Sequence, residues 1–459
     1  MISADAIKDL RNGLRGALIQ PGDDSYDEAR RVYNRAIDRH PALIARCAGV
    51  DDVRRSVEFA RRNAIPATVR AGGHNVAGRA LNDGGLVIDL TAMRGMRVDP
   101  GTRTTHAQAG LRYRDFDSET QAFGLATTGG TVSETGIAGL TLGGGLGWLM
   151  RLHGMACDNL ISADVVTSEG NFLIASEQEN PDLFWALRGG GGQFGIVTNF
   201  QYQLHPVGDF LGGMLVHPMA RAGDVIRHFR DFMRSANDET IAVAAFSHTP
   251  DGMPVTLQPC AHFGPPEESE RTLEPLRRNS PPLADQVGKT SYCAMNQLLD
   301  AGFPSGLHNY WSARYLGSLE DELIERLVEA YQNPPTPLCA IVFEPLGGAV
   351  NRVPVDATAF HLRAGEVNLV VAARWSDPAD AEKCVDWVRG VIRAAEPFAI
   401  EGRYLNYLAA DEDPAAVYGA AKQSRLMDIK KKYDPTGFFR LNPGEITLVC
   451  NNLRDTTTG

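Results

Sequence analysis

Hydrophobic patterns in the first half of the chain predict alternating helices and strands. Apolar positions at helical spacing behind an acidic cap predict a helix over residues 51–60. Short apolar runs at 67–70 and 86–90 predict strands, and a polar-capped stretch at 112–123 predicts another helix. Residues 164–175 are expected to form a hairpin around a Glu-Gly-Asn turn. The pattern is that of a mixed α+β domain.

Apolar and polar residues alternate strictly over residues 197–204, which predicts a half-buried strand. The pattern changes after this segment. His205 and Pro206 end this alternation, and we place a domain boundary there. A second set of elements follows: helices at 225–236, 267–278, 319–331 and 379–395, a hairpin turning at 250–252, and strands at 339–344 and 367–375. Strands with helices to one side make a second α+β lobe.

Composition excludes several classes of function. The 459 residues are 43% hydrophobic and 22% charged, as in ordinary globular proteins, and the length fits two domains. A net charge of −11 repels phosphate backbones, so no nucleic-acid partner is expected. The acidic N-terminus lacks the features of a signal peptide, and no apolar run is long enough to cross a membrane. We therefore expect a cytoplasmic enzyme.

The cysteine, histidine and lysine residues show no metal-binding or disulfide pattern. Seven scattered cysteines without a C-x-x-C pair predict free thiols. Histidines such as His106, His153, His228 and His361 form no ligand or triad spacing. The three consecutive lysines at 430–432 are expected to lie at a solvated helix end, where cations interact favourably with the helix dipole.

Glycine is concentrated in the first two hundred residues. Residues 190–195 fit G-x-G-x-x-G, but a predicted helix precedes them and a strand follows, which is the reverse of a dinucleotide-binding unit. The loop at 70–75 follows a strand, and its tandem glycines can direct N–H groups at a pyrophosphate. On spacing alone, His74 in this loop is either a hydrogen-bonded turn residue or a reactive group. The glycine-dense stretch at 129–148 suits a large planar cofactor, and 154–160 follows it.

Six segments in this order resemble the berberine bridge enzyme-like branch of the vanillyl-alcohol oxidase and p-cresol methylhydroxylase flavoprotein superfamily. They are 70–75, 131–148, 154–160, 194–197, the Tyr-Leu-Asn-Tyr at 404–407, and 433–442. The resemblance covers nearly the whole chain. It implies an α+β, two-domain flavoprotein, with an FAD-binding domain from residues 1–205 and 400–459 and a substrate domain from 206–399.

The resemblance also implies how FAD is held. His74 would be bonded to the flavin 8α-methyl group and Cys157 to ring carbon 6, which makes the attachment bicovalent. Two such bonds raise the potential of the ring, whose redox chemistry belongs to the cofactor. The remaining cofactor-binding residues expected from the motifs are Arg70, Ala71, Gly72, Gly73, Asn75, Thr131, Gly136, Gly139, Thr141, Gly143, Gly144, Gly147, Leu160, Gly195, Val197, Asn406 and Asn442.

Some positions depart from the family pattern or allow two interpretations. Val76 stands where plant members often carry a tyrosine, and Val370 where a Glu or Gln base is expected, which argues against alkaloid cyclisation. Leu160 matches a position that gates oxygen, or is simply a core leucine. Tyr404 and Tyr407 match tyrosines that face the flavin, and either can take a substrate proton only if its site lowers its pKa.

The expected function is oxidation of a small organic molecule by bound FAD. The first hypothesis is an alcohol of sugar, aromatic or polyketide type, which loses its O–H proton to Tyr404 or Tyr407. Molecular oxygen is the expected acceptor and gives hydrogen peroxide. The alternatives are an amine oxidase of the hydroxynicotine oxidase type, a dehydrogenase with another acceptor, and a binding protein without turnover.

Overall fold

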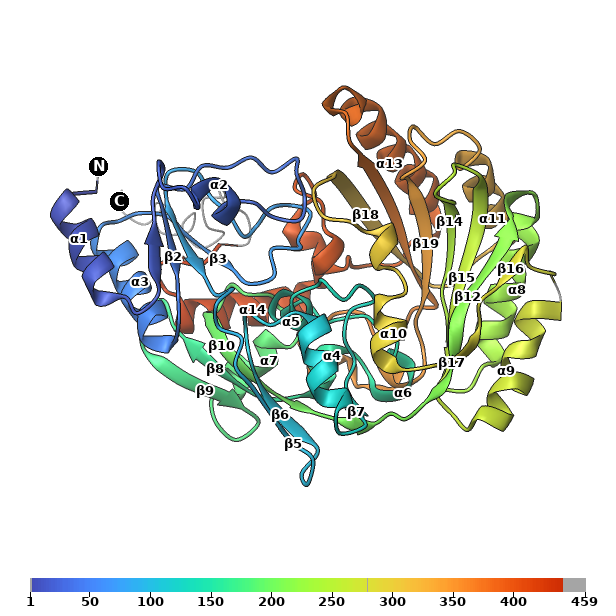
Figure 1. The fold of residues 1–459 in the computed structure, drawn as a ribbon, viewed down its shortest axis with the longest axis horizontal. Helices are drawn as coiled ribbons and strands as arrows, with labels where there is room; N and C mark the ends of the chain where they lie inside the picture. The colour runs from blue at the N-terminus through green and yellow to red at the C-terminus, as the bar shows by residue number, and fades with distance from the viewer. Residues whose placement is uncertain (1, 279, 441–459) are drawn as a thin grey trace, which may run out of the picture.

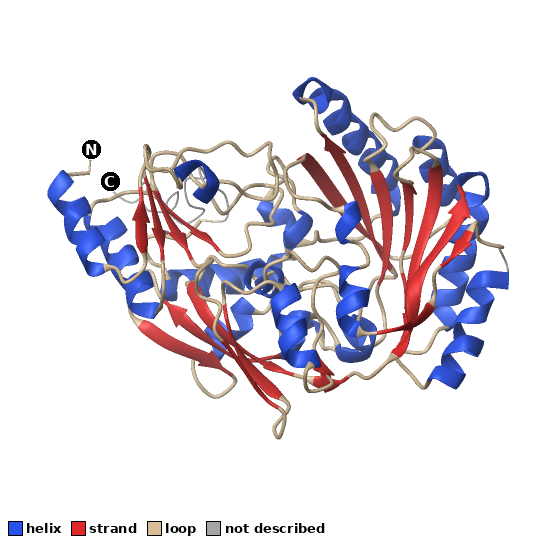
Figure 2. Ribbon diagram, in the orientation of Figure 1, coloured by secondary structure: helices blue, strands red, loops and turns tan. Residues whose placement is uncertain are grey.

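Two separate sheets form the N-terminal part of the molecule (Figures 1 and 2). The computed structural model describes residues 2–278 and 280–440. The first sheet has the order β1-β2-β4-β3, with β2, β4 and β3 parallel and β1 antiparallel at the edge. Its strands are β1 (Ala17–Ile19), β2 (Leu43–Arg46), β3 (Ala67–Arg70) and β4 (Leu86–Asp89). The helix α3 (Val50–Arg62) packs on this sheet because one of its sides is apolar.

The second sheet is antiparallel, with the order β5-β6-β10-β8-β9. Its strands are β5 (Met96–Asp99), β6 (Thr104–Gln108), β8 (Leu160–Val166), β9 (Phe172–Ser176) and β10 (Ile196–Gln203). The helices around the two sheets are α1 (Ala4–Gly13), α2 (Tyr26–Ala29), α4 (Tyr113–Gln121), α5 (Ile137–Leu142), α6 (Met150–His153) and α7 (Pro181–Leu187). A small pair, β7 (Leu125–Ala126) with β11 (His205–Pro206), leads out of this part.

The last part of the described chain returns to these two sheets. The helix α14 (Ala420–Tyr433), red in Figure 1, lies beside α7. Leu405, Leu426 and Tyr433 belong to the same buried cluster as residues of α3 and β10. One apolar core therefore joins side chains from both ends of the chain.

The middle of the chain forms a nine-stranded sheet whose main path has the order β16-β12-β15-β14-β19-β20-β18. Its strands are β12 (Phe210–Pro218), β13 (Thr240–Ala242), β14 (Ala244–His248), β15 (Pro254–His262), β16 (Ala284–Asp285), β17 (Gly288–Thr290), β18 (His308–Leu316), β19 (Ala340–Pro345) and β20 (Val367–Trp375). Four helices cover one face: α8 (Ala222–Ser235), α9 (Pro266–Arg278), α11 (Asp321–Ala330) and α13 (Ala381–Ala395). The short helices α10 (Tyr292–Gln297) and α12 (Ala349–Arg352) lie near the other part of the molecule. The fold is thus two-domain and α+β, as predicted.

Period-two alternation gives the central strands two different faces. Ile341 and Phe343 of β19 belong to the core under the helices, whereas Val342 and Glu344 face a cavity on the opposite side. Strand β20 repeats this pattern, with Val371 on the helix side. The outer helices therefore stabilise the sheet while its inner face remains available for a ligand.

The predicted helices and strands are present within a few residues of their predicted ends. The helix α7 precedes the glycines at 189–192 and β10 follows them, so the inverted order that argued against a dinucleotide-binding unit is confirmed. The prediction that residues 430–432 form a solvated helix end is wrong for Lys430. Its ammonium group is buried and donates to Asp434 and to the carbonyl groups of Gln193 and Phe439. Within the described residues, no helix is long and apolar enough to cross a bilayer.

A buried ion pair lies between the two parts of the molecule. Both guanidinium Nη atoms of Arg363 donate to the carboxylate of Asp158, at 2.6 and 2.7 Å, and both side chains are less than a tenth exposed. We expect Arg363→Met to lower the stability of the protein by about 3–5 kcal/mol, because it leaves a buried carboxylate without its partner. A lower urea midpoint would report this loss. The Arg363→Met/Asp158→Leu double variant should regain much of it, and equal midpoints for Arg363→Met and wild type would contradict the prediction.

Candidate functional site

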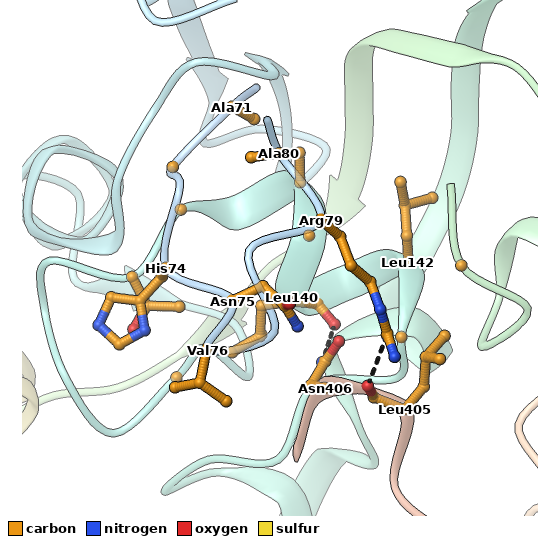
Figure 3. A pocket seen from close by; sticks show the side chains of 18 of the residues that line it. Ala71, His74, Asn75, Val76, Arg79, Ala80, Leu140, Leu142, Leu405 and Asn406 are labelled. Atoms are coloured by element: carbon orange, nitrogen blue, oxygen red, sulfur yellow. Dashed lines mark hydrogen bonds between the residues drawn. The ribbon is translucent and has the colours of Figure 1, made fainter. Parts of the chain in front are cut away.

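A long cavity of about 330 Å³ lies between the two domains. One end is lined by the first sheet and by the glycine-rich loops, and the other by the inner face of the nine-stranded sheet. Residues 404–407 also line it, and two hydrogen bonds fasten this segment to the N-terminal loops (Figure 3). Asn406 Nδ2 donates to the Leu140 carbonyl at 3.0 Å, and Arg79 Nη1 donates to the Leu405 carbonyl at 3.3 Å. The cavity therefore needs both ends of the chain.

His74 stands in the cavity wall in the loop after β3 (Figure 3). Its ring stacks on Tyr33 with 3.9 Å between the ring centroids. Enclosure of the ring lowers the pKa of His74 to about 4, so the imidazole is neutral at physiological pH. Its Nε2 atom is buried and has no hydrogen-bond partner among the described residues. A buried ring nitrogen without a partner inside the protein is available for bonding to a ligand.

Glycines allow the loops that line the cavity to approach each other closely. A Cβ atom on Gly72 would stand 2.5 Å from the Cα atom of Gly136, and one on Gly143 would stand 2.1 Å from Asn406 Oδ1. Any larger residue would push these segments apart. The loops at 70–75 and 136–143 therefore form a cradle of bare backbone, which suits an extended polar cofactor.

Most of the predicted site residues line this cavity. They are Ala71, Gly72, Gly73, His74, Asn75, Thr131, Gly136, Gly139, Gly143, Gly195, Val197, Tyr404, Asn406 and Tyr407. Six others lie behind its surface and are not in its lining: Arg70, Thr141, Gly144, Gly147, Cys157 and Leu160. Asn442 falls outside the described residues.

The six residues behind the cavity surface support the loops. Thr141 is hydrogen-bonded to the hydroxyl group of Tyr202 at 2.8 Å, and Leu160 is a buried member of the first core. A Cβ atom on Gly147 would collide with the carbonyl oxygen of Gly129, so this glycine permits close packing of the backbone. The core interpretation of Leu160 therefore agrees with its position.

Cys157 is not among the residues that line the cavity in which His74 stands. Its side chain is fully buried in a 3₁₀ turn, and its Sγ atom lies 3.7 Å from Asp158 Oδ1. Burial and the adjacent carboxylate raise the pKa of the thiol, which opposes formation of a thiolate. The glycine-rich loop presents Val132 to the cavity instead, and no described cysteine lines it. The position of Cys157 is that of a core thiol.

The two predicted catalytic tyrosines have different surroundings. The Tyr404 hydroxyl oxygen accepts hydrogen bonds from the N–H groups of Gly145 and Leu146, at 3.1 and 3.2 Å, and from Asn406 Nδ2 at 3.0 Å. Three donors occupy the lone pairs of this oxygen. Burial outweighs these hydrogen bonds and raises the pKa of Tyr404, so this residue is well suited to holding the loop and poorly suited to acting as a base.

Tyr407 is paired with a carboxyl group that the sequence analysis did not identify. Its hydroxyl group donates to Glu344 Oε1 at 3.0 Å, and Asn368 Nδ2 donates to Glu344 Oε2 at 2.7 Å. Glu344 is 7% exposed and lines the cavity. Burial raises its pKa to about 7, so the carboxyl group exchanges protons near neutral pH. The sequence did contain a signal for this residue, because Glu344 is the acidic last position of the otherwise apolar strand predicted at 339–344.

The rest of this end of the cavity is apolar. Val76 and Val370, the two departures from the family pattern, both line it. The remaining lining residues from the nine-stranded domain are Val243, Leu299, Phe303, Trp311, Val342 and Ala372. Glu344 is thus the only charged side chain that the described part of this domain contributes.

Comparison with known proteins places this arrangement in a family. Residues 41–176 match the family described as an FAD binding domain, and residues 403–444 match berberine and berberine-like proteins. An FAD-linked oxidoreductase of Dictyostelium discoideum is 30% identical over 95% of this chain and 96% of its own length.

Two solved structures show the same fold. The crystal structure of 6-hydroxy-D-nicotine oxidase from Arthrobacter nicotinovorans has a TM-score of 0.86 at 28% identity, covering 94% of this chain and 97% of the other. The berberine bridge enzyme-like protein 1 of Physcomitrella patens has a TM-score of 0.88 at 23% identity, covering 96% and 99%. With both family matches and the relative from Dictyostelium discoideum, the chain belongs to the berberine bridge enzyme-like family of FAD-linked oxidoreductases.

Proposed function

We propose that His74 carries the FAD through a single covalent bond. The unpaired, neutral Nε2 atom of this residue and the glycine cradle beside it fit a flavin. The bicovalent attachment predicted from the resemblance lacks this support, because Cys157 is buried outside the cavity lining. The backbone of the loops at 70–75 and 136–143 would hold the rest of the cofactor.

We propose that the protein oxidises a small alcohol in the apolar end of the cavity. The observation that carries this proposal is the Tyr407–Glu344 pair, in which a buried hydroxyl group whose own pKa is raised donates to a carboxyl group with a pKa of about 7. Bound FAD supplies the two-electron acceptor for the hydride of the substrate carbon. Tyr407 takes the O–H proton of the substrate as its own proton passes to Glu344, so no charged tyrosine has to persist in a buried site.

The cavity walls narrow the proposed substrate to a largely apolar, ring-containing alcohol. Sugars carry several hydroxyl groups, each of which loses water on binding and needs a polar partner in the protein. Among the described residues of the nine-stranded domain, the cavity wall offers Glu344 as its only charged group, beside valines, leucine and aromatic rings. Of the substrate classes expected from the sequence, aromatic and polyketide alcohols fit this wall better than sugars.

A cyclic amine is the second candidate, and similarity to 6-hydroxy-D-nicotine oxidase favours it. An amine can lose hydride as its neutral form without giving up an O–H proton. The Tyr407→Phe variant separates the two cases. It should lose most activity toward an alcohol and keep most activity toward an amine.

The test of the proposed function is anaerobic reduction of the purified holoenzyme. A benzylic secondary alcohol, a cyclic secondary amine of similar size and a disaccharide are compared at equal concentration, with loss of flavin absorbance as the signal. We expect the alcohol to bleach the flavin, and readmitted oxygen to give one hydrogen peroxide per molecule oxidised. Reduction by the disaccharide alone would refute the proposed substrate class. Reoxidation only by an artificial acceptor would identify a dehydrogenase.

A further inference from the structure

Three side chains of the nine-stranded domain meet at a point outside the flavin cavity. Glu239 precedes β13, His262 ends β15, and Glu268 lies in the first turn of α9. One ligand atom from each of them lies within 4.8 Å of the other two. The labels β15 and α9 in Figure 1 mark two of the elements involved. Three separate segments of chain therefore converge on one position.

The hydrogen bonds around His262 fix which of its ring nitrogens carries a proton. Thr240 Oγ1 donates its only proton to Asn237 Oδ1 at 2.6 Å. The same oxygen lies 2.9 Å from His262 Nδ1, so it accepts a hydrogen bond from Nδ1–H. In the neutral ring this leaves Nε2 with a bare lone pair.

The Nε2 atom of His262 is buried and points at the carboxylates. The side chain is fully buried, and Nε2 has no hydrogen-bond partner among the described residues. It lies 3.9 Å from Glu239 Oε2, which is too far for a hydrogen bond. A lone pair that faces two carboxylates is repelled by them unless a cation stands between.

Gly264 lies directly against two of the three groups. A Cβ atom at this position would stand 2.4 Å from His262 Nε2 and 2.9 Å from Glu239 Oε2, so any larger residue would collide with both potential ligand atoms. The glycine thus lets these two atoms lie close together beside the backbone.

We propose that Glu239, His262 and Glu268 bind one divalent transition-metal ion of the zinc class. One imidazole nitrogen and two carboxylate oxygens suit zinc, with water as the fourth ligand, whereas calcium and magnesium prefer oxygen ligands alone. The bond from His262 Nδ1 to Thr240 is the outer contact that orients a metal-binding imidazole.

The metal ion would stabilise the nine-stranded domain near the place where this domain contacts the flavin-binding part. It would join the start of β13 to the end of β15 and the start of α9. The carbonyl oxygen of Thr240 in β13 accepts a hydrogen bond from Arg151 Nε of α6 at 3.0 Å. The proposed role is therefore structural, and it does not depend on the identity of the substrate.

Metal binding is tested on untagged holoenzyme that has been treated with a chelator. Titration with ZnCl₂ in a calorimeter should give one site per chain, and the bound zinc should raise the melting temperature. Glu268→Gln should weaken binding by about tenfold or more, since it removes a ligand. Glu267→Gln, an exposed neighbour in the same turn, is the matched control and should bind zinc as wild type does. His262→Gln should abolish the site, with the flavin spectrum confirming that the variant is folded.

Three results would overturn the proposal. The first is the absence of stoichiometric zinc binding by the wild type. The second is equal weakening in Glu267→Gln and Glu268→Gln, which indicates unspecific binding to surface carboxylates. The third is magnesium or calcium binding as tight as that of zinc and unchanged in His262→Gln. Each result can be obtained without measuring oxidase activity.

Discussion

The His74→Ala variant is expected to release all of its FAD when the protein is precipitated with acid, whereas wild type retains it in the pellet. The reason is that His74 is the cavity residue with a neutral, unpaired ring nitrogen. Intact mass and the colour of the pellet report the bond directly. Because the cradle of backbone groups remains, the variant should still bind FAD reversibly before denaturation.

Cys157→Ala is the control that separates one bond from two. We expect it to keep one covalent FAD, because the thiol is buried outside the cavity lining. If FAD is released only from the double variant, both residues carry the cofactor and the single-bond proposal is wrong. Release from the wild type would show that neither residue forms a bond.

Glu344→Gln should lower kcat/KM for an alcohol substrate by about 10²–10⁴, the usual contribution of a positioned base. Wild-type activity should rise with pH through about 7, because the pKa of Glu344 lies there and only the ionised carboxyl group can accept the proton. This rise should be absent from the variant. Steady-state kinetics from pH 5.5 to 8.5, about 1.5 units to either side of that pKa, would record both effects.

Two tyrosine variants test the route of the proton. Tyr407→Phe should reproduce most of the loss in Glu344→Gln, because the two groups act as a pair. Tyr404→Phe removes a hydroxyl group that accepts three hydrogen bonds, so it should lower flavin content or stability more than it changes the pH profile. A loss confined to Tyr404→Phe would assign the base to that residue instead.

Local patterns were sufficient to predict most helices and strands. The helix over 51–60 and the strand over 67–70 follow from apolar spacing, which acts over a few residues; the predicted acidic cap lies in the first turn of the helix, and its N-cap is Gly49. The cavity residues near His74 followed from a family motif. Such motifs give the order of residues along the chain but do not show which side of a loop each one faces. Cys157 lies in one of the motif segments but is buried in a core cluster.

Pairings across the sheet could not be predicted from local patterns. Glu344 meets Asn368 because β19 and β20 are neighbours in register, and it meets Tyr407 because the end of the chain returns to the first domain. The cluster around His262 has the same origin, since spacing in the sequence does not bring Glu239 and Glu268 to it. The burial of Lys430 likewise depends on contacts with a distant loop.

The return of residues 404–440 to the first domain has a consequence for biosynthesis. A ribosome finishes the strands and helices of the middle segment before Asn406 and α14 have emerged, and these residues complete the wall around the cofactor. The middle segment can thus collapse as a unit during translation, while the N-terminal sheets wait for their last partner. Enclosure of the flavin, and any bond to His74, must therefore follow synthesis of residues 404–440, so the cofactor is needed in the expressing cell at that stage.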